Sequence, residues 1–135
     1  MIKLKSKEVD FQTFLLACTF LKKSKEMEIA VSGISMLPLY AKDIQITTVR
    51  HIEDLKSLKR FDIIIFWQNN ILISHYYWKR NEHFNDDPND PNIVTRPLNP
   101  IRSFDHPIKS AQILGILPEK INLWLKIKIL FCNYF

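Results

Sequence analysis

The chain has 135 residues, of which 47% are hydrophobic and 24% charged, and its formal net charge is +5. That length fits one domain over 1–135 with a buried core, and the composition excludes a disordered chain or a repeat array. Because basic residues are interspersed with acidic ones, the charge indicates an ordinary solvated surface, and no nucleic-acid partner is expected.

The first predicted element is a helix over about 10–23. Asp10 is a plausible N-cap, and apolar residues follow it at spacings of three and four. The run is too short to span a bilayer and too interrupted for a secretory leader, so a helix that packs on the body of the protein is predicted. Its expected apolar face comprises Phe11, Phe14, Leu15, Cys18 and Leu21.

A mostly β body is expected over about 28–117, which makes the fold class α+β with a dominant sheet. The clearest signal is a hairpin, in which two β-branched and aromatic runs flank the turn residues Asn69 and Asn70. Strands are predicted at 29–31, 44–49, 61–67, 71–78, 93–96 and 110–117, and the polar stretch 81–92 is predicted to be a surface loop.

The C-terminal segment 119–135 combines apolar and aromatic residues with interspersed lysines, and its secondary structure is ambiguous from the pattern. A core or dimer element is the favoured interpretation. The alternative is an amphipathic segment that makes peripheral contact with a membrane surface. The sequence leaves the oligomeric state open.

The two cysteines, Cys18 and Cys132, lie in apolar stretches near opposite ends of the chain, without CxxC spacing. They are interpreted as free thiols of a reducing compartment, so a cytoplasmic location is expected. The histidines His51, His83 and His106 show no metal-ligand spacing. With only two glycines, phosphate-binding loops are excluded, and neither metal nor cofactor is expected.

Ser35 is the candidate nucleophile. It follows Gly33 by two residues and precedes Pro38, a context that predicts a turn between strands. A serine in such a turn can expose its hydroxyl while nearby backbone N–H groups face a developing oxyanion. A turn serine is more often structural, so this signal alone is weak.

His75 is the candidate general base. By strand alternation it shares a face with Ile73 and Tyr77, where a histidine either has a structural partner or acts as a base. Asp105 is the candidate third member, because a carboxylate on the second ring nitrogen would fix the imidazole tautomer. Asp62, Asp43 and the acidic residues of the 81–92 loop are rival carboxylates.

Several segments together resemble the signal peptidase I and LexA-like serine peptidases. The segment Ser32-Gly33-Ile34-Ser35-Met36-Leu37-Pro38 resembles their nucleophile box. His75 stands where these families carry the general base, and histidine there is typical of the branch that includes the endoplasmic-reticulum and SipW-type enzymes. Residues 42–48, 60–66, 95–99, 105–107 and 112–115 resemble later blocks of the family in the same order.

The resemblance implies a LexA/signal-peptidase-like β fold and a serine endopeptidase that acts on a peptide or protein. Ser35 would be the nucleophile, His75 the base and Asp105 the residue that orients it. Gly33, Met36 and the Ser35 backbone would form the substrate and oxyanion side. The chain is closest to the short relatives without a membrane anchor.

Three departures from the family pattern favour an alternative. Both Gly-Asp pairs lack their glycine and read Lys42-Asp43 and Phe61-Asp62, and Tyr76-Tyr77 follows His75. The alternative is a catalytically degenerate module that keeps the peptidase fold for binding or regulation.

Overall fold

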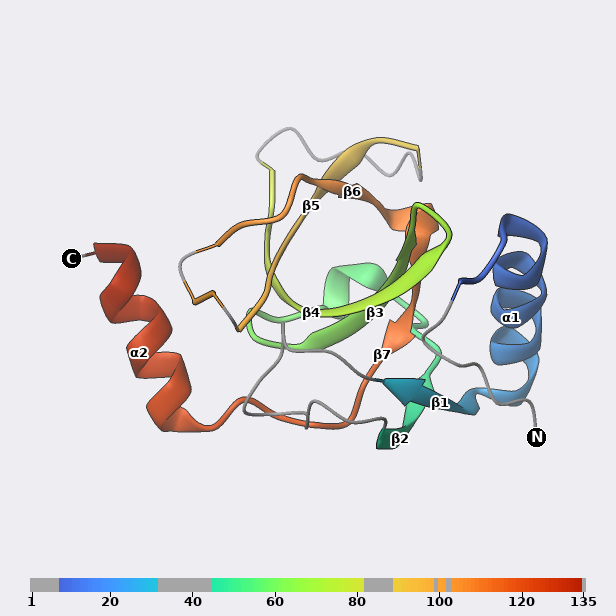
Figure 1. Cartoon of the computed structure of the whole chain (residues 1–135), viewed down its shortest axis with the longest axis horizontal. Coiled ribbons are helices and arrows are strands. Elements are labelled where there is room, and N and C mark those ends of the chain that lie inside the picture. The colour runs from blue at the N-terminus through green and yellow to red at the C-terminus, as the bar shows by residue number, and fades with distance from the viewer. Residues whose placement is uncertain (1–7, 32–44, 82–88, 99, 102, 135) are drawn as a thin grey trace.

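Seven strands form one sheet, in the order β1-β2-β7-β3-β4-β5-β6, and every neighbouring pair is antiparallel. The computed structural model describes residues 8–31, 45–81, 89–98, 100–101 and 103–134. The helices α1 and α2 lie on opposite sides of the molecule (Figure 1).

In chain order the elements are α1 (Phe11–Ser24), β1 (Glu26–Val31), β2 (Gln45–Arg50), the 3-10 helix η1 (Leu55–Ser57), β3 (Ile63–Gln68), β4 (Ile71–Arg80), β5 (Pro91–Arg96), β6 (Ile108–Lys109), the 3-10 helix η2 (Ser110–Gln112), β7 (Ile113–Ile116) and α2 (Leu123–Tyr134). The prediction of a mostly β fold with a helix before it is confirmed.

The helix α1 begins and ends at the residues that its sequence favours. The Asp10 carboxylate accepts a hydrogen bond from the Thr13 N–H at 2.8 Å, which satisfies a donor of the first turn. At the other end Lys25 adopts a left-handed conformation with φ of 73°, and its N–H donates to the Leu21 carbonyl at 2.8 Å.

The buried face of α1 differs from the predicted one. Phe14, Ala17 and Leu21 are buried, whereas Phe11 and Leu15 are 50% and 42% exposed. At 100° per residue the three buried positions fall within a narrow sector, and Phe11 and Leu15 lie 60° to 100° away from Phe14. The helix therefore contacts the sheet through a narrower stripe than its apolar composition suggests.

The hairpin of β3 and β4 is confirmed at its predicted position. Asn69 and Asn70 have φ of 51° and 64°, the left-handed values of the two-residue turns that match the twist of antiparallel strands. Asparagine tolerates this conformation better than most residues. The turn sets the register, in which Gln68 pairs with Ile71 and Ile64 pairs with His75.

The predicted strand over 110–117 is wrong in its first part. Residues 110–112 form η2, and β7 begins at Ile113. The Gln112 side chain accepts from the Lys109 N–H at 2.9 Å and donates to the Trp67 carbonyl at 2.9 Å, so it holds a tight turn that an extended chain could not make. The short strand β6 was not predicted, and 119–135, left undecided from the sequence, contains α2.

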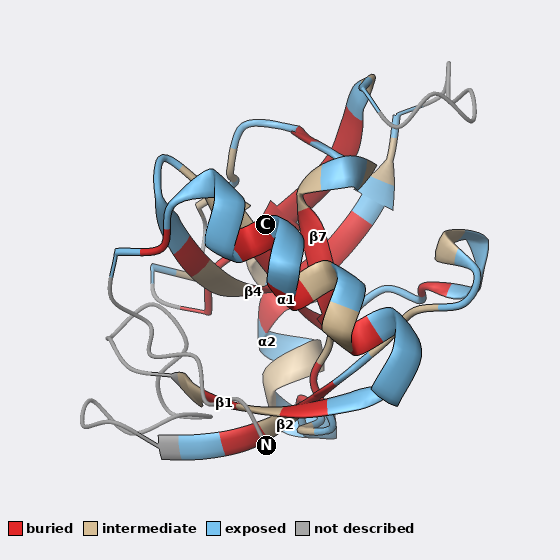
Figure 2. Ribbon diagram, turned by 90° about the vertical axis from the view of Figure 1, so that its right-hand side faces the viewer, coloured by how far each residue is buried: buried red, intermediate tan, exposed pale blue. Residues whose placement is uncertain are grey.

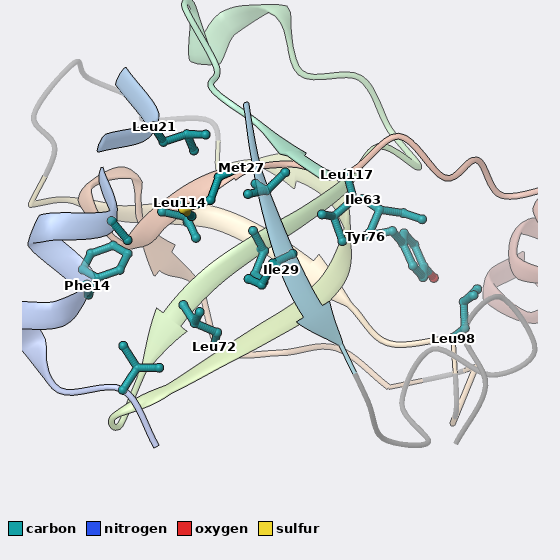
Figure 3. Close-up of a cluster of buried hydrophobic side chains, with 14 of the residues drawn as sticks. Phe14, Leu21, Met27, Ile29, Ile63, Leu72, Tyr76, Leu98, Leu114 and Leu117 are labelled. Carbon is teal, nitrogen blue, oxygen red and sulfur yellow. The ribbon is translucent and has the colours of Figure 1, made fainter. Parts of the chain in front are cut away.

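The core consists of two clusters on opposite faces of the strands. The first includes residues of both helices and of one sheet face. Figure 3 shows Phe14 and Leu21 of α1 together with Met27 and Ile29 of β1. The second includes Ile64, Phe66, Tyr77 and Ile93. Alternation along each strand sends neighbouring residues to different clusters. The strands at the centre are accordingly buried, while turns and outer helix surfaces are exposed (Figure 2).

The ribbon of β1 and β2 joins the rest of the sheet at a crowded point. Arg50 of β2 pairs with Ile116 of β7. A Cβ atom on the neighbouring Gly115 would lie 2.5 Å from the Arg50 carbonyl oxygen and 2.6 Å from a Val49 methyl carbon. The absence of a side chain at Gly115 lets the ribbon approach β7.

Neither helix of the described residues combines the length and the apolar character that crossing a lipid bilayer requires. The helices α1 and α2 contain 14 and 12 residues. A spanning helix needs about 20 apolar residues.

Candidate active site

His75 lies at the middle of the sheet, on a strand that has neighbours on both sides. On the β3 side it pairs with Ile64, and the edge of its ring faces the Phe66 ring at a centroid separation of 6.0 Å. The residue is 9% exposed. Its position in alternation places it on the same face as Tyr77, as the sequence predicts.

Asp105 is the partner that the structure gives His75. Its Oδ2 atom lies 2.5 Å from Nδ1 of the imidazole. The same oxygen accepts a hydrogen bond from the Thr95 hydroxyl at 2.6 Å, and the Asp105 N–H donates to the Thr95 carbonyl at 3.0 Å. Two contacts of the carboxylate and one of the backbone therefore fix Asp105 against β4 and β5, although its side chain is 25% exposed.

Arg96 holds the segment that carries Asp105. This residue is fully buried, and its guanidinium donates to the carbonyls of Ile101 at 2.7 Å and Ser103 at 3.2 Å. It also lies 4.1 Å from the centre of the Phe104 ring, a cation–π distance. Burial lowers the pKa of the Arg96 guanidinium. The chain after β5 is thus folded back so that Asp105 meets the neighbouring strand.

Sequence reasoning did not assign roles to Thr95 and Arg96. A signal for Thr95 was present, because it lies on β5 opposite Tyr77 and two residues from Ile93, which belongs to the cluster on the His75 face. Arg96 falls in the segment 95–99 that resembles a late block of the family, but composition alone suggests an ordinary surface cation.

A carboxylate at Nδ1 has a defined chemical consequence for the imidazole. It favours the tautomer in which Nδ1 carries the hydrogen, and so leaves the lone pair on Nε2. Among the described residues, none forms a hydrogen bond with Nε2 of His75. This arrangement is suited to accept a proton from a hydroxyl group and to stabilise the imidazolium that results.

The predicted nucleophile cannot be placed relative to His75. Ser35, Gly33 and Met36 lie outside the described residues, in the interval between the end of β1 at Val31 and the start of β2 at Gln45. The structure therefore brings together the predicted base and the predicted orienting carboxylate.

The rival carboxylates have other positions. Asp62 accepts from the Lys59 N–H at 2.8 Å and lies 3.8 Å from the Lys120 ammonium, so its carboxylate is engaged away from His75. Asp43, His83 and residues 82–88 of the acidic loop lie outside the described residues. Within the part of the chain that the structure describes, no three His, Cys, Asp or Glu side chains gather as a metal site would require.

Phe61 has an unusual backbone conformation beside the site. Its φ is 79°, in the left-handed region that glycine adopts without strain and that costs most other residues about 1 to 2 kcal/mol. The Phe61 N–H donates to the Tyr77 carbonyl at 2.9 Å, and its ring packs against Tyr76 and Trp78 at 5.9 and 6.0 Å. These contacts retain the residue in a conformation that its side chain disfavours.

Tyr76, Cys18 and Cys132 are further titratable groups outside the pair of His75 and Asp105. The Tyr76 hydroxyl is buried, with no hydrogen-bond partner among the described residues. Burial, aided by the nearby Asp105 charge, raises the pKa of Tyr76 to about 12. Cys18 and Cys132 are free and half-buried, and burial raises the pKa of Cys18 to about 11, which makes its thiol a poor nucleophile at neutral pH.

Comparison of the chain with protein-family models, with curated proteins and with solved structures finds no match. The assignment of a function therefore depends on the residues of the chain and on the geometry around His75.

Proposed function

We propose that the chain is a serine endopeptidase of the signal-peptidase/LexA type, with Ser35 as nucleophile, His75 as general base and Asp105 as the residue that orients the base. The observation that carries the proposal is the 2.5 Å contact between His75 Nδ1 and Asp105 Oδ2. A carboxylate in that position is what a base of this kind needs, and the sequence singled out both residues for that relationship.

The proposed reaction has two halves. His75 Nε2 removes the Ser35 hydroxyl proton as the serine oxygen bonds to the scissile carbonyl carbon, and the oxyanion is stabilised by the Ser35 backbone N–H. The C–N bond then breaks, and the amine leaves with the proton from His75. Water repeats the sequence on the acyl-serine, which releases the acid and restores Ser35 and neutral His75. This mechanism requires no metal or cofactor.

Two features of the fold support the proposal. The strand β1, which leads into the Ser35 segment, is an edge strand of the sheet, so an extended peptide could pair with it as an added strand. Phe61 has a glycine-like φ at the position where the resemblance implies the glycine of a Gly-Asp pair. A glycine would adopt this φ without strain, which supports the alignment of this segment with the family.

The substrate in this proposal is an extended peptide or a flexible protein segment. Gly33 would let the substrate backbone come close to the nucleophile, and Met36 would contact a substrate side chain. The free cysteines fit a cytoplasmic enzyme.

The proposal is tested by incubating the full chain with a peptide library derived from a proteome digest and identifying new termini by mass spectrometry. Cleavage is expected with the wild-type chain and not with Ser35→Ala or His75→Gln. Ser32→Ala, a serine of the same segment, is the matched control and should retain cleavage. Equal products from the wild type and Ser35→Ala would remove Ser35 from the chemistry. An absence of cleavage by folded wild-type protein would favour the non-catalytic module.

A further inference from the structure

The helix α2 is apolar on two opposite sides. Its inner side packs on the sheet, where Ile129 is fully buried and Leu125 and Leu130 contact the first core cluster. Ile121, two residues before the helix, is 3% exposed, so the segment that leads into α2 is also buried in the core. One side of α2 therefore belongs to the core. A core element was one of the two interpretations that the sequence allowed for this segment.

The outer side of α2 carries large apolar side chains that the fold leaves in contact with solvent. Positions 123, 127 and 131 are four apart and therefore lie along one line of the helix, with position 124 beside it. The exposed fractions are 73% for Leu123, 73% for Trp124, 49% for Ile127 and 62% for Phe131. We call these four residues the outer stripe. Isolated exposed apolar residues are normal, but a continuous row on one helix indicates a binding surface.

Within α2 and the residues that lead into it the charged side chains have one sign, although the Lys120 ammonium lies 3.8 Å from the Asp62 carboxylate. From residue 120 to residue 135 the sequence contains Lys120, Lys126 and Lys128 and no acidic residue. Lys128 is exposed next to the stripe, and the Lys120 side chain is 72% exposed. The Lys126 ammonium lies 5.5 Å from the Phe61 ring centre, at the boundary between α2 and the body of the protein.

We propose that α2 binds an anionic lipid bilayer, with the outer stripe in the interface between headgroups and acyl chains and Lys128 at the lipid phosphates. An apolar stripe bordered by lysines is the pattern of helices that lie in the plane of a membrane. Trp124 suits the interface between headgroups and acyl chains because indole combines an apolar ring with one polar N–H. Each lysine near an anionic surface adds attraction. This inference does not depend on the proposed peptidase activity.

A second copy of the chain suits the stripe less well. A two-fold contact between outer stripes would place the same surface on both sides, so Lys128, which borders the stripe, would approach a surface of like charge on the other copy. Residues 120–135 contain no acidic group to compensate that repulsion. An anionic lipid surface supplies the compensating charge.

The test is co-sedimentation of the full chain with phosphatidylcholine vesicles, with and without phosphatidylglycerol. Binding is expected only with phosphatidylglycerol, and it should weaken at high salt. Leu123→Asn should lower the partition coefficient at least about tenfold. Leu16→Asn, on the outer surface of α1, is the matched control, because Leu16 is 71% exposed and Leu123 73%. Both sites are exposed, so both variants should fold.

Charge and depth are tested separately. Lys128→Gln should weaken binding about fivefold, whereas Lys79→Gln, an exposed lysine on β4, should leave it unchanged. Vesicles should shift the tryptophan emission of the wild type to shorter wavelength. Trp124→Phe should still bind and should lose that shift, because Trp78 is buried and Trp67 half-buried.

Three results would overturn the inference. One is equal vesicle binding by Leu123→Asn and Leu16→Asn. Another is equal binding to vesicles with and without phosphatidylglycerol. The third is a dimer that Leu123→Asn dissociates in a chain that binds no vesicles, which would assign the outer stripe to a second copy.

Discussion

The Oδ2 atom of Asp105 lies 2.5 Å from Nδ1 of His75, and the Thr95 hydroxyl donates to the same oxygen at 2.6 Å. One carboxylate oxygen thus joins β4, β5 and the chain segment that follows β5. The imidazole cannot turn about the side-chain bonds of His75 without breaking this contact. The orientation of the imidazole therefore depends on two adjacent strands, β4 and β5, and can be tested apart from the proposed nucleophile.

Asp105→Asn is expected to lower the rate of peptide cleavage about a hundredfold or more while the chain stays folded. An amide can donate its N–H to Nδ1, which favours the wrong imidazole tautomer. The measurement is kcat/KM on the best peptide from the library digest, with circular dichroism to verify folding. Asp62→Asn is the matched control, because Asp62 is also partly buried but contacts Lys59. Equal losses in the two variants would mean that the Asp105 contact has no special role.

Thr95→Val is expected to lower kcat about tenfold with little change in KM, because it removes a hydrogen bond of about 1.5 kcal/mol that positions the carboxylate. Thr95→Ser retains the hydroxyl and should recover most of the activity. The split between kcat and KM is the informative readout. A loss that serine fails to recover would indicate that the packing of the methyl group, rather than the hydroxyl, is what matters.

Local patterns in the sequence located most of the elements. The Asp10 cap, the Asn69-Asn70 turn and the alternation of 44–49 each depend on a few neighbouring residues, and the corresponding α1, hairpin and β2 are present. The failures arose from contacts between distant residues. The Gln112 side chain reaches the Trp67 carbonyl and ends the predicted strand, and no periodicity near residue 112 contains that information.

The candidate site likewise has one residue that local sequence pattern identifies and one whose choice depends on contacts between distant residues. His75 on an apolar strand face was visible from alternation, and Asp105 was one of several carboxylates that chemistry alone could not rank. What selects Asp105 is the return of the chain after β5, which depends on the Arg96 contacts with the Ile101 and Ser103 carbonyls. A buried arginine that has no carboxylate partner among the described residues is rare enough that no composition rule predicts it.

Arg96→Met is expected to lower the free energy of unfolding by about 3 kcal/mol. Methionine fills part of the volume, but it cannot donate to the two carbonyls or stack on Phe104. Urea denaturation measures the change. Arg60→Met is the control, because Arg60 also stacks on the Trp78 ring, with its guanidinium carbon 4.0 Å from the ring centre, and donates to the Trp78 carbonyl at 3.0 Å, but is exposed. It should cost about 1 kcal/mol or less. Comparable costs would contradict the role given to Arg96.

Gly115→Ala is expected to destabilise the chain by about 1 to 3 kcal/mol, because the new methyl group meets the Arg50 carbonyl at 2.5 Å. The clash separates β2 from β7, so amide exchange should increase in β1 and β2 more than in the β3–β4 hairpin. Hydrogen exchange with mass spectrometry resolves the difference. Since β1 and β2 flank the Ser35 segment, peptide cleavage should fall as well. An equal increase of amide exchange in all strands would show that Gly115 does not specifically control the contact of β1 and β2 with β7.

Tyr76 gives the chain a predicted loss of stability at high pH. Its pKa is raised from the ordinary 10.0 to about 12 in the folded state, mainly by burial. The folded chain therefore keeps the phenolic proton more tightly than the unfolded chain. The resulting stability is fully present below pH 10, falls as the unfolded tyrosine ionises, and is lost once the pH passes the folded pKa. Between about pH 9 and about pH 11 this amounts to a loss of about 1.4 kcal/mol.

Tyr76→Phe should remove that part of the pH dependence. At neutral pH the variant should be as stable as the wild type or slightly more stable, because the hydroxyl has no hydrogen-bond partner among the described residues. Urea denaturation at both pH values gives the comparison. Tyr77→Phe, the neighbouring buried tyrosine, should retain the alkaline loss. If Tyr76→Phe instead destabilises the chain at neutral pH by more than about 1 kcal/mol, the hydroxyl stabilises the fold and the expectation is wrong.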